Sequence, residues 1–169
     1  MLDVRPVLYA PGTSLPFRFS LDLSDLDFSG QRPITQPVDV EGVVRNNADA
    51  LSLDLSASTV LDAQCDRCGK RFPLPKRTDF HCLLAEALQD DDNDEFVLLK
   101  DGQVDVADLA RTAFVLNMDT KTLCSETCKG LCPRCGANLN EGLCGCKPDI
   151  DPRWAALSAL LEPDAPDEP

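Results

Sequence analysis

The sequence lacks the motifs of the common enzyme classes. No GxGxxG, P-loop, GxSxG or HExxH pattern occurs in its 169 residues, and these are the patterns that hold phosphate groups or activate a nucleophile or a water molecule. The only histidine, His81, alternates toward the polar side of a strand pattern and is interpreted as a surface imidazole. We therefore expect a protein that is not an enzyme and has no small-molecule substrate.

Long apolar runs are also missing. No segment approaches the roughly 18 apolar residues that a membrane span needs, and the N-terminal MLDVRPVLYAPGTSLPF has no basic region followed by an apolar one. We expect a cytoplasmic protein that does not contact membranes. Because the cytosol keeps thiols reduced, the nine cysteines favour metal binding over a disulfide framework.

Positive charge is scarce. The chain has 16 Lys and Arg against 29 Asp and Glu, a formal net charge of −13, which opposes long-range attraction to nucleic-acid phosphates. One basic stretch with an aromatic side chain forms the candidate RNA-binding surface: Arg67, Lys70, Arg71, Phe72, Lys76 and Arg77. The alternative for this stretch is a solvated strand edge that discourages aggregation. The acidic run 90–95 is interpreted as a solubilising loop.

A hydrophobic period of two marks the first part of the chain as β structure. Between Leu51 and Ala63 the odd positions are almost all apolar and the even ones mostly Ser or Asp, which is typical of a half-buried strand or of two strands joined at a bulge. Shorter alternating runs occur in FRFSLDL, VDVEGVV and TDFHCLL. In the last of these, Cys82 shares a face with Phe80 and Leu84 and is interpreted as a small core residue.

Helical spacing appears later in the chain. The segment DVADLARTAFVLN predicts a helix with Asp105 as its N-cap, and DPRWAALSALL predicts a short terminal helix. The fold class expected is α+β: a mostly antiparallel β-sheet or partial barrel covered by one helix, with a C-terminal zinc-knuckle lobe and the terminal helix. The expected divisions are a β-rich domain over 1–123, a cysteine-rich zinc-binding lobe and helix over 124–161, and a disordered acidic tail over 162–169.

The spacing of the cysteines carries the strongest signal. Eight of them form close pairs: Cys65 with Cys68, Cys124 with Cys128, Cys132 with Cys135, and Cys144 with Cys146. Two pairs share a local sequence, CDRCG and CPRCG, in which the glycine permits a left-handed turn that aims backbone amides at the thiolates. This chemistry predicts one or two structural Zn²⁺ ions, because tetrahedral sites with four cysteines have no open catalytic position.

Two groupings of these ligands are open at the level of sequence. In the first, Cys132, Cys135, Cys144 and Cys146 form one compact site, and the pair at Cys65 joins the pair at Cys124 across the fold. In the second, Cys128 shares one ion with Cys132, Cys135 and either Cys144 or Cys146. The second grouping leaves the N-terminal pair incomplete or disulfide-bonded.

The order of these features resembles the YceD family, the large ribosomal RNA subunit accumulation proteins. The resemblance runs from about Val38 to Leu161 and is most specific in CKGLCPRCGANLN, CGC and DPRWAAL, as in a variant of the family with a cysteine-rich C-terminus. It implies a role in accumulation or maturation of 23S rRNA and in assembly of the large subunit, without a catalytic residue. The long acidic stretch 90–95 departs from the family pattern.

The resemblance implies a precursor of the large ribosomal subunit as partner. The contact is either with 23S rRNA, through the basic stretch and Phe72, or with a basic ribosomal protein, through the acidic surface. Two other functions are open: a thiol redox protein with a thiolate of low pKa, and a zinc-dependent protein interaction module unrelated to ribosomes.

Overall fold

The computed structural model describes residues 1–28, 30–48, 50–86 and 96–146. The elements in these ranges are β1 (Leu2–Asp3), α1 (Arg5–Leu8), β2 (Ser14–Leu21), β3 (Val38–Asn47), β4 (Ala50–Gln64), β5 (Arg71–Ala85), β6 (Phe96–Leu98), β7 (Gln103–Val104) and α2 (Val106–Leu116). The predicted terminal helix, the acidic run 90–95 and the acidic tail lie outside the described residues. In the described part, neither helix has the length and apolar character needed to cross a bilayer.

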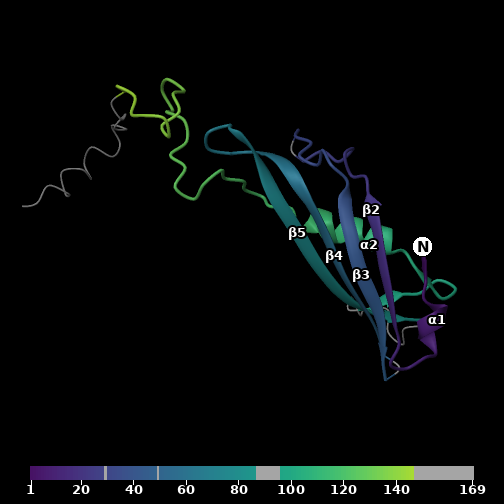
Figure 1. Ribbon diagram of the computed structural model, residues 1–169. Helices are drawn as coiled ribbons and strands as arrows, with labels where there is room; N and C mark the ends of the chain where they lie inside the picture. Colours follow the sequence, from purple (N-terminus) through teal and green to yellow (C-terminus); the bar gives the residue numbers. More distant parts are fainter. Residues whose placement is uncertain (29, 49, 87–95, 147–169) are drawn as a thin grey trace, which may run out of the picture.

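A five-stranded sheet forms most of the fold (Figure 1). Its order is β2-β3-β4-β5-β6, with antiparallel pairs except for the short parallel pair of β5 and β6. The expectation of a mostly antiparallel sheet is therefore confirmed. The sheet does not close into a barrel, because β2 and β6 stand at opposite edges and β6 reaches only the last three residues of β5.

The alternation between Leu51 and Ala63 produces one long strand, β4, without a break. Its hairpin with β3 closes at the pair Asn47 and Ala50. The buried hydrophobic side chains of β4 lie on one face: Leu51, Leu53, Leu55, Ala57, Leu61 and Ala63. The strand thus has one apolar face, which must be covered by another layer.

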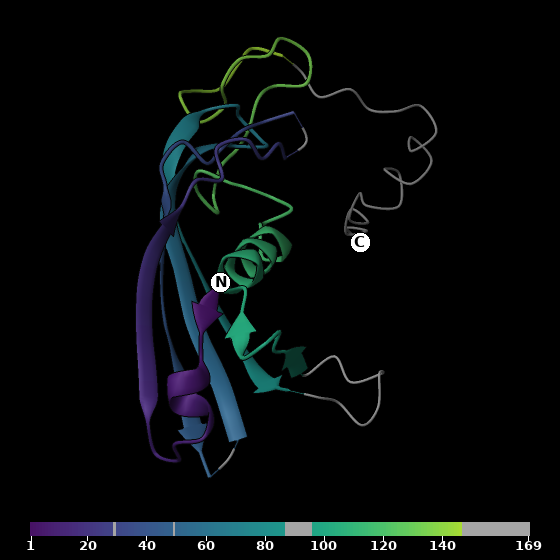
Figure 2. The ribbon, with the colours of Figure 1, turned by 90° about the vertical axis from the view of Figure 1, so that its right-hand side faces the viewer.

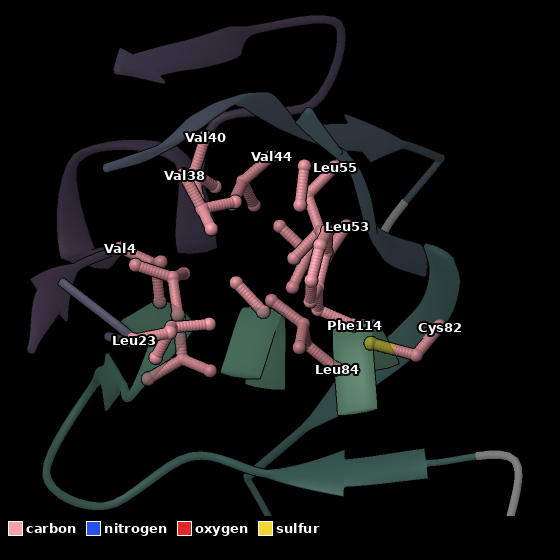
Figure 3. Close-up of a cluster of buried hydrophobic side chains, with 14 of the residues drawn as sticks. Val4, Leu23, Val38, Val40, Val44, Leu53, Leu55, Cys82, Leu84 and Phe114 are labelled. Carbon is pink, nitrogen blue, oxygen red and sulfur yellow. The ribbon is translucent and has the colours of Figure 1, made fainter. Parts of the chain in front are cut away.

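Helix α2 covers this apolar face of the sheet (Figure 2). It begins where the sequence predicted, since a carboxylate oxygen of Asp105 accepts a hydrogen bond from the N–H of Asp108 at 3.0 Å. Phe114 of α2 is fully buried in the core, together with valines of β3 and leucines of β4 (Figure 3). Cys82 belongs to this core with its sulfur directed inward, as predicted.

The N-terminal segment lies on the same side of the sheet as α2, an arrangement that the sequence did not predict (Figure 2). β1 pairs with β7, the strand that leads into α2. The short helix α1 is held by Asn46 of β3, which is fully buried and donates hydrogen bonds to the carbonyls of Val7 at 2.8 Å and Leu8 at 3.0 Å. A buried amide is tolerated there because it satisfies carbonyls that the short helix leaves free.

At Gly42 of β3 the sheet leaves no room for a side chain. A Cβ atom at this position would lie 2.5 Å from the carbonyl oxygen of Asp54 and 2.5 Å from Cζ of Phe17. We expect Gly42→Ala to lower the free energy of unfolding by about 1–3 kcal/mol, because the neighbouring backbone must move to admit the methyl group. Denaturant unfolding measures the change, and Gly145→Ala is the control, since nothing lies within 4 Å of a Cβ there. Equal stability of the two variants would contradict the prediction.

Candidate metal centres

Eight cysteines gather into two groups of four that could each hold a metal ion. The first centre is Cys65, Cys68, Cys124 and Cys128, and the second is Cys132, Cys135, Cys144 and Cys146. In each group the sulfur atoms all lie within 4.8 Å of one another. The structure therefore brings the cysteines together in the first of the two groupings considered from the sequence, and it places Cys128 apart from Cys132 and Cys135.

The first knuckle is the turn between β4 and β5. It is closed by two backbone hydrogen bonds, from the N–H of Cys65 to the carbonyl of Lys70 at 2.9 Å and from the N–H of Gly69 to the carbonyl of Cys65 at 2.8 Å. Gly69 has a φ of +70°, in the left-handed region that glycine adopts without strain. The two cysteines of this turn are thereby fixed to the end of the sheet.

The second knuckle repeats this turn. The N–H of Cys132 donates to the carbonyl of Ala137 at 2.8 Å, the N–H of Gly136 donates to the carbonyl of Cys132 at 2.9 Å, and the φ of Gly136 is +72°. The same hydrogen bonds at the same spacing follow from the shared sequence CxRCG. The repeat is thus one of conformation as well as of sequence.

The two residues between Cys65 and Cys68 hold the other half of the first centre. Asp66 accepts a hydrogen bond from the N–H of Thr122 at 2.5 Å and donates its own N–H to the Thr122 carbonyl at 2.9 Å. The guanidinium of Arg67 donates to the Cys128 carbonyl at 2.8 Å. These contacts bind the segment that carries Cys124 and Cys128 to the end of the sheet.

The cysteines of the first centre are not joined by disulfide bonds. The sulfurs of Cys65 and Cys128 are 3.8 Å apart and those of Cys68 and Cys124 are 3.7 Å apart, whereas a disulfide requires about 2.05 Å. All nine cysteines are free thiols. Three of the four in this centre are buried, with Phe72 and Leu123 packed against them. In the second centre only Cys132 is buried and Cys135 is exposed, so that centre is more open to solvent.

Each centre combines thiols of low and high pKa. The backbone N–H of Cys124, helped by those of Cys68 and Arg67, lowers the pKa of Cys65 to about 6 against the opposing effect of burial. Backbone N–H groups of Cys135 and Arg134 likewise lower the pKa of Cys132 to about 6. Burial raises the pKa of Cys124 to about 12. Aligned amides of this kind are typical of turns that stabilise thiolates.

The ninth cysteine differs from the other eight. Burial, followed by the nearby Asp54 carboxylate, raises the pKa of Cys82 to about 11. This thiol lies in the sheet core rather than beside either centre. The Cys82 side chain is therefore a protonated thiol at neutral pH and packs as a small core residue.

The predicted RNA-binding surface is divided in the structure. Phe72 and Lys76 lie on one side of β5, where Phe72 packs against the core and the first centre, and the side chain of Lys76 is 12% exposed and pairs with Asp119. Arg71 and Arg77 are exposed on the other side of the strand. The sequence stretch thus does not form one continuous basic face.

Most of these cations already have partners. Arg71 forms an ion pair with Asp62 at 2.7 Å and Arg77 forms one with Asp79 at 3.1 Å. Arg67 contacts backbone carbonyls at the first centre, and Lys70 is exposed beside it. The structural role of Arg67 was missed in the sequence because charge alone does not reveal a contact with a carbonyl 61 residues away.

Comparison with known proteins identifies the family. The model of the family described as "Large ribosomal RNA subunit accumulation protein YceD" matches residues 53–161, a region that contains all eight cysteines of the two centres. The chain belongs to the YceD family. No solved structure matches this member of the family.

Curated relatives of this YceD member come from plants and mycobacteria. "Large ribosomal RNA subunit accumulation protein YCED homolog 1, chloroplastic" of Zea mays is 30% identical over 73% of this chain and 53% of its own length, and the Arabidopsis thaliana protein of the same name is 27% identical over 77% and 50%. An uncharacterized protein of Mycobacterium tuberculosis is 32% identical over 44% of this chain and 36% of its own length.

The chain spans about half the length of the plant relatives it matches. Their names place those relatives in the chloroplast, and the cytoplasmic location expected for the present chain stays a prediction.

Metal retention should depend on pH. A metal-bound cysteine is a thiolate, so protons compete with the metal for each sulfur. Even the thiols with the most depressed pKa, Cys65 and Cys132 at about 6, take up protons as the pH falls through that value. We expect metal-loaded protein to retain its metal at about pH 8 and release it by about pH 5. Release is measured with a chromophoric chelator, and retention that is flat across this range would contradict thiolate ligation.

Proposed function

We propose that this chain is a zinc-stabilised, non-enzymatic factor that promotes accumulation of 23S rRNA by binding a component of the assembling large ribosomal subunit. The observation that carries the proposal is the family match over residues 53–161, which includes both cysteine centres. The names of the two plant relatives describe such an accumulation protein. A binding role agrees with the absence of nucleotide-binding and hydrolase motifs from the sequence.

Zinc is the metal that the cysteine centres fit best. Four thiolates place zinc in a tetrahedron with Zn–S distances of about 2.3 Å, and the edge of that tetrahedron is about 3.8 Å. The sulfur separations of 3.8 Å and 3.7 Å in the first centre match this edge. With four protein ligands no position is open for a substrate, so the role of the metal is to stabilise the fold.

We favour a basic protein over RNA as the direct partner. The chain has a formal net charge of −13, and three of the cations in its basic stretch, Arg71, Lys76 and Arg77, are paired with carboxylates. Phosphate binding would have to break these pairs, which removes much of the gain from counterion release. A partner rich in Lys and Arg is instead attracted by the acidic surface.

A groove beside the first centre has the character needed for such a partner. It has a volume of about 600 Å³ and lies between the loop at 27–33, the end of β4 and the segment after α2. Its apolar walls include Phe28, Leu61 and Met118, and Leu116 at its rim is 78% exposed. Three aspartates also line it, and among the described residues that line it none is basic.

The acidic character of this groove is only partly neutralised. Asp119 pairs with Lys76, whereas Asp27 and Asp66 accept hydrogen bonds from the backbone N–H groups of Gly30 and Thr122. Apolar walls together with unpaired carboxylates suit a segment that carries both apolar and basic side chains. Ribosomal proteins with basic extensions are partners of this chemistry.

The function is tested by removing the protein from cells. We expect depletion to lower the amount of 23S rRNA relative to 16S rRNA, and the wild-type chain to restore it. The double variant Cys65→Ser and Cys68→Ser should not restore it, because loss of the first centre releases the segment after α2 from the sheet. Purified protein should contain about two zinc ions per chain. An unchanged rRNA ratio would contradict the function, and metal-free protein with readily alkylated thiols would favour the redox alternative.

The class of partner is tested by copurification at moderate salt. We expect a basic large-subunit protein to remain bound after nuclease treatment and to be lost with Leu116→Asp, which places a charge on the apolar rim of the groove. Leu143→Asp is the matched control, because Leu143 is 91% exposed and does not line the groove.

The competing result is RNA binding. In that case nuclease would release the partner, and the double variant Lys70→Glu and Arg71→Glu would reduce RNA retention and its dependence on salt, while Leu116→Asp would have no effect. Arg67 is left unchanged in this variant because it holds the first centre.

A further inference from the structure

The side chain of Asn140 links the two cysteine centres. Asn140 lies in the loop between Cys135 and Cys144, which are ligands of the second centre. Its side-chain amide nevertheless donates a hydrogen bond to the sulfur of Cys128, a member of the first centre, at 3.4 Å. Asn140 therefore belongs to one centre by sequence and contacts the other in space.

The position of this amide is fixed from both sides. The side-chain oxygen of Asn140 accepts a hydrogen bond from the backbone N–H of Lys129 at 2.8 Å, and the side-chain nitrogen of Asn140 also donates to the side-chain oxygen of Asn138 at 2.8 Å. With the oxygen held by Lys129, the nitrogen is directed at the Cys128 sulfur. The orientation of the amide is thus set by its hydrogen bonds, and a rotated amide would lose both contacts.

Backbone contacts connect the same two regions. The N–H of Leu131 donates to the Arg67 carbonyl at 3.1 Å, and the N–H of Leu139 donates to the Gly130 carbonyl at 2.9 Å. A Cβ at Gly130 would lie 3.0 Å from the Arg67 carbonyl oxygen. The chain from Cys128 to Leu131 is therefore packed between the first knuckle and the loop that carries Asn140.

We propose that Asn140 is a positioning residue that couples the two centres, so that metal bound at the second centre raises the affinity of the first. Metal at the second centre orders the loop between Cys135 and Cys144 and thereby holds the Asn140 amide against the Cys128 sulfur. An N–H group directed at a thiolate ligand stabilises its negative charge, and loss of such outer contacts typically lowers metal affinity by about 10- to 100-fold. By linkage, metal at the first centre favours metal at the second by the same factor.

The coupling is tested in the full-length chain by cobalt binding. Cobalt substitutes for zinc and gives a thiolate-to-metal absorption band, and a competing chelator then reports the affinity of each centre. The double variant Cys135→Ser and Cys144→Ser removes the second centre and isolates the signal of the first. We expect this variant to weaken cobalt binding at the first centre by about 10-fold or more.

Two substitutions of Asn140 separate the hydrogen bond from the loop. Asn140→Asp keeps an oxygen to accept from Lys129 but loses the N–H that faces the sulfur, and Asn140→Ala loses both. We expect either variant to lower the cobalt affinity of the first centre by about 10-fold. In a double-mutant cycle, loss of the second centre should then cause no further decrease in that affinity. Glu141→Ala is the control in the same loop, since the Glu141 carboxylate accepts its hydrogen bond from the Asn138 amide and is bonded to Asn138 rather than to a cysteine.

This inference rests on the proposed metal centres, and the two fail in different ways. A protein that binds no metal at either centre would overturn the proposed zinc sites themselves. If both centres load but the first keeps its affinity in Asn140→Asp and after loss of the second centre, the centres are independent and the coupling is overturned. Circular dichroism of each variant is the check that the sheet is retained in these comparisons.

Discussion

The first cysteine centre is the constraint on which the arrangement of the chain depends. It joins the turn between β4 and β5 to residues that follow α2, and Cys128 comes 63 positions after Cys65 in the chain. The segment from 118 to 146 contains no helix or strand in the described part of the chain, and the apolar side chains packed at the centre are few. Hydrophobic burial therefore contributes little there, and in the proposed function the metal bound by the four cysteines closes this long loop and orders the segment.

The sheet acts as a rigid support for this centre. The knuckle is the turn of the longest hairpin, β4 and β5, which pair over 14 residues. α2 packs on the same sheet, so the segment between α2 and Cys124 is held at both ends. The groove beside the centre is lined by residues of β4, of α2 and of the segment that follows α2. Its shape therefore depends on whether the centre holds that segment in place.

Charge and burial explain why the basic stretch is a poor guide to the partner. Its residues from Arg71 to Arg77 alternate between the two sides of β5, because successive side chains of a strand point in opposite directions. Phe72 and Lys76 are used inside the protein, and the exposed arginines are paired with neighbouring aspartates. The surface that a partner meets is therefore decided by pairing across strands and loops. A count of cations along the chain overestimates the positive charge that is available.

Local chemistry could be predicted from the sequence with success. The alternation in β4, the cap at Asp105 and the turns of the two CxRCG knuckles each depend on residues within a few positions of one another, and each forms as expected. The short elements β1, α1 and β7 were not predicted, because they are stabilised by contacts with distant parts of the chain, such as those of Asn46 with α1. A partial barrel was also compatible with the sequence, because the alternation of apolar and polar residues identifies single strands. It does not show whether the edge strands of the sheet pair with each other to close a barrel.

The metal-ligand spacing of eight cysteines and the resemblance to the YceD family can be recognised in the amino-acid sequence alone. Which pairs of cysteines meet is a property of the folded chain, because Cys65 and Cys124 are brought together by the path of β5 and α2 rather than by their spacing. The tertiary structure alone also placed Asn140 of the second loop against Cys128 of the first centre. Distances between residues far apart in the sequence are set by packing and loop closure, and no local pattern encodes them.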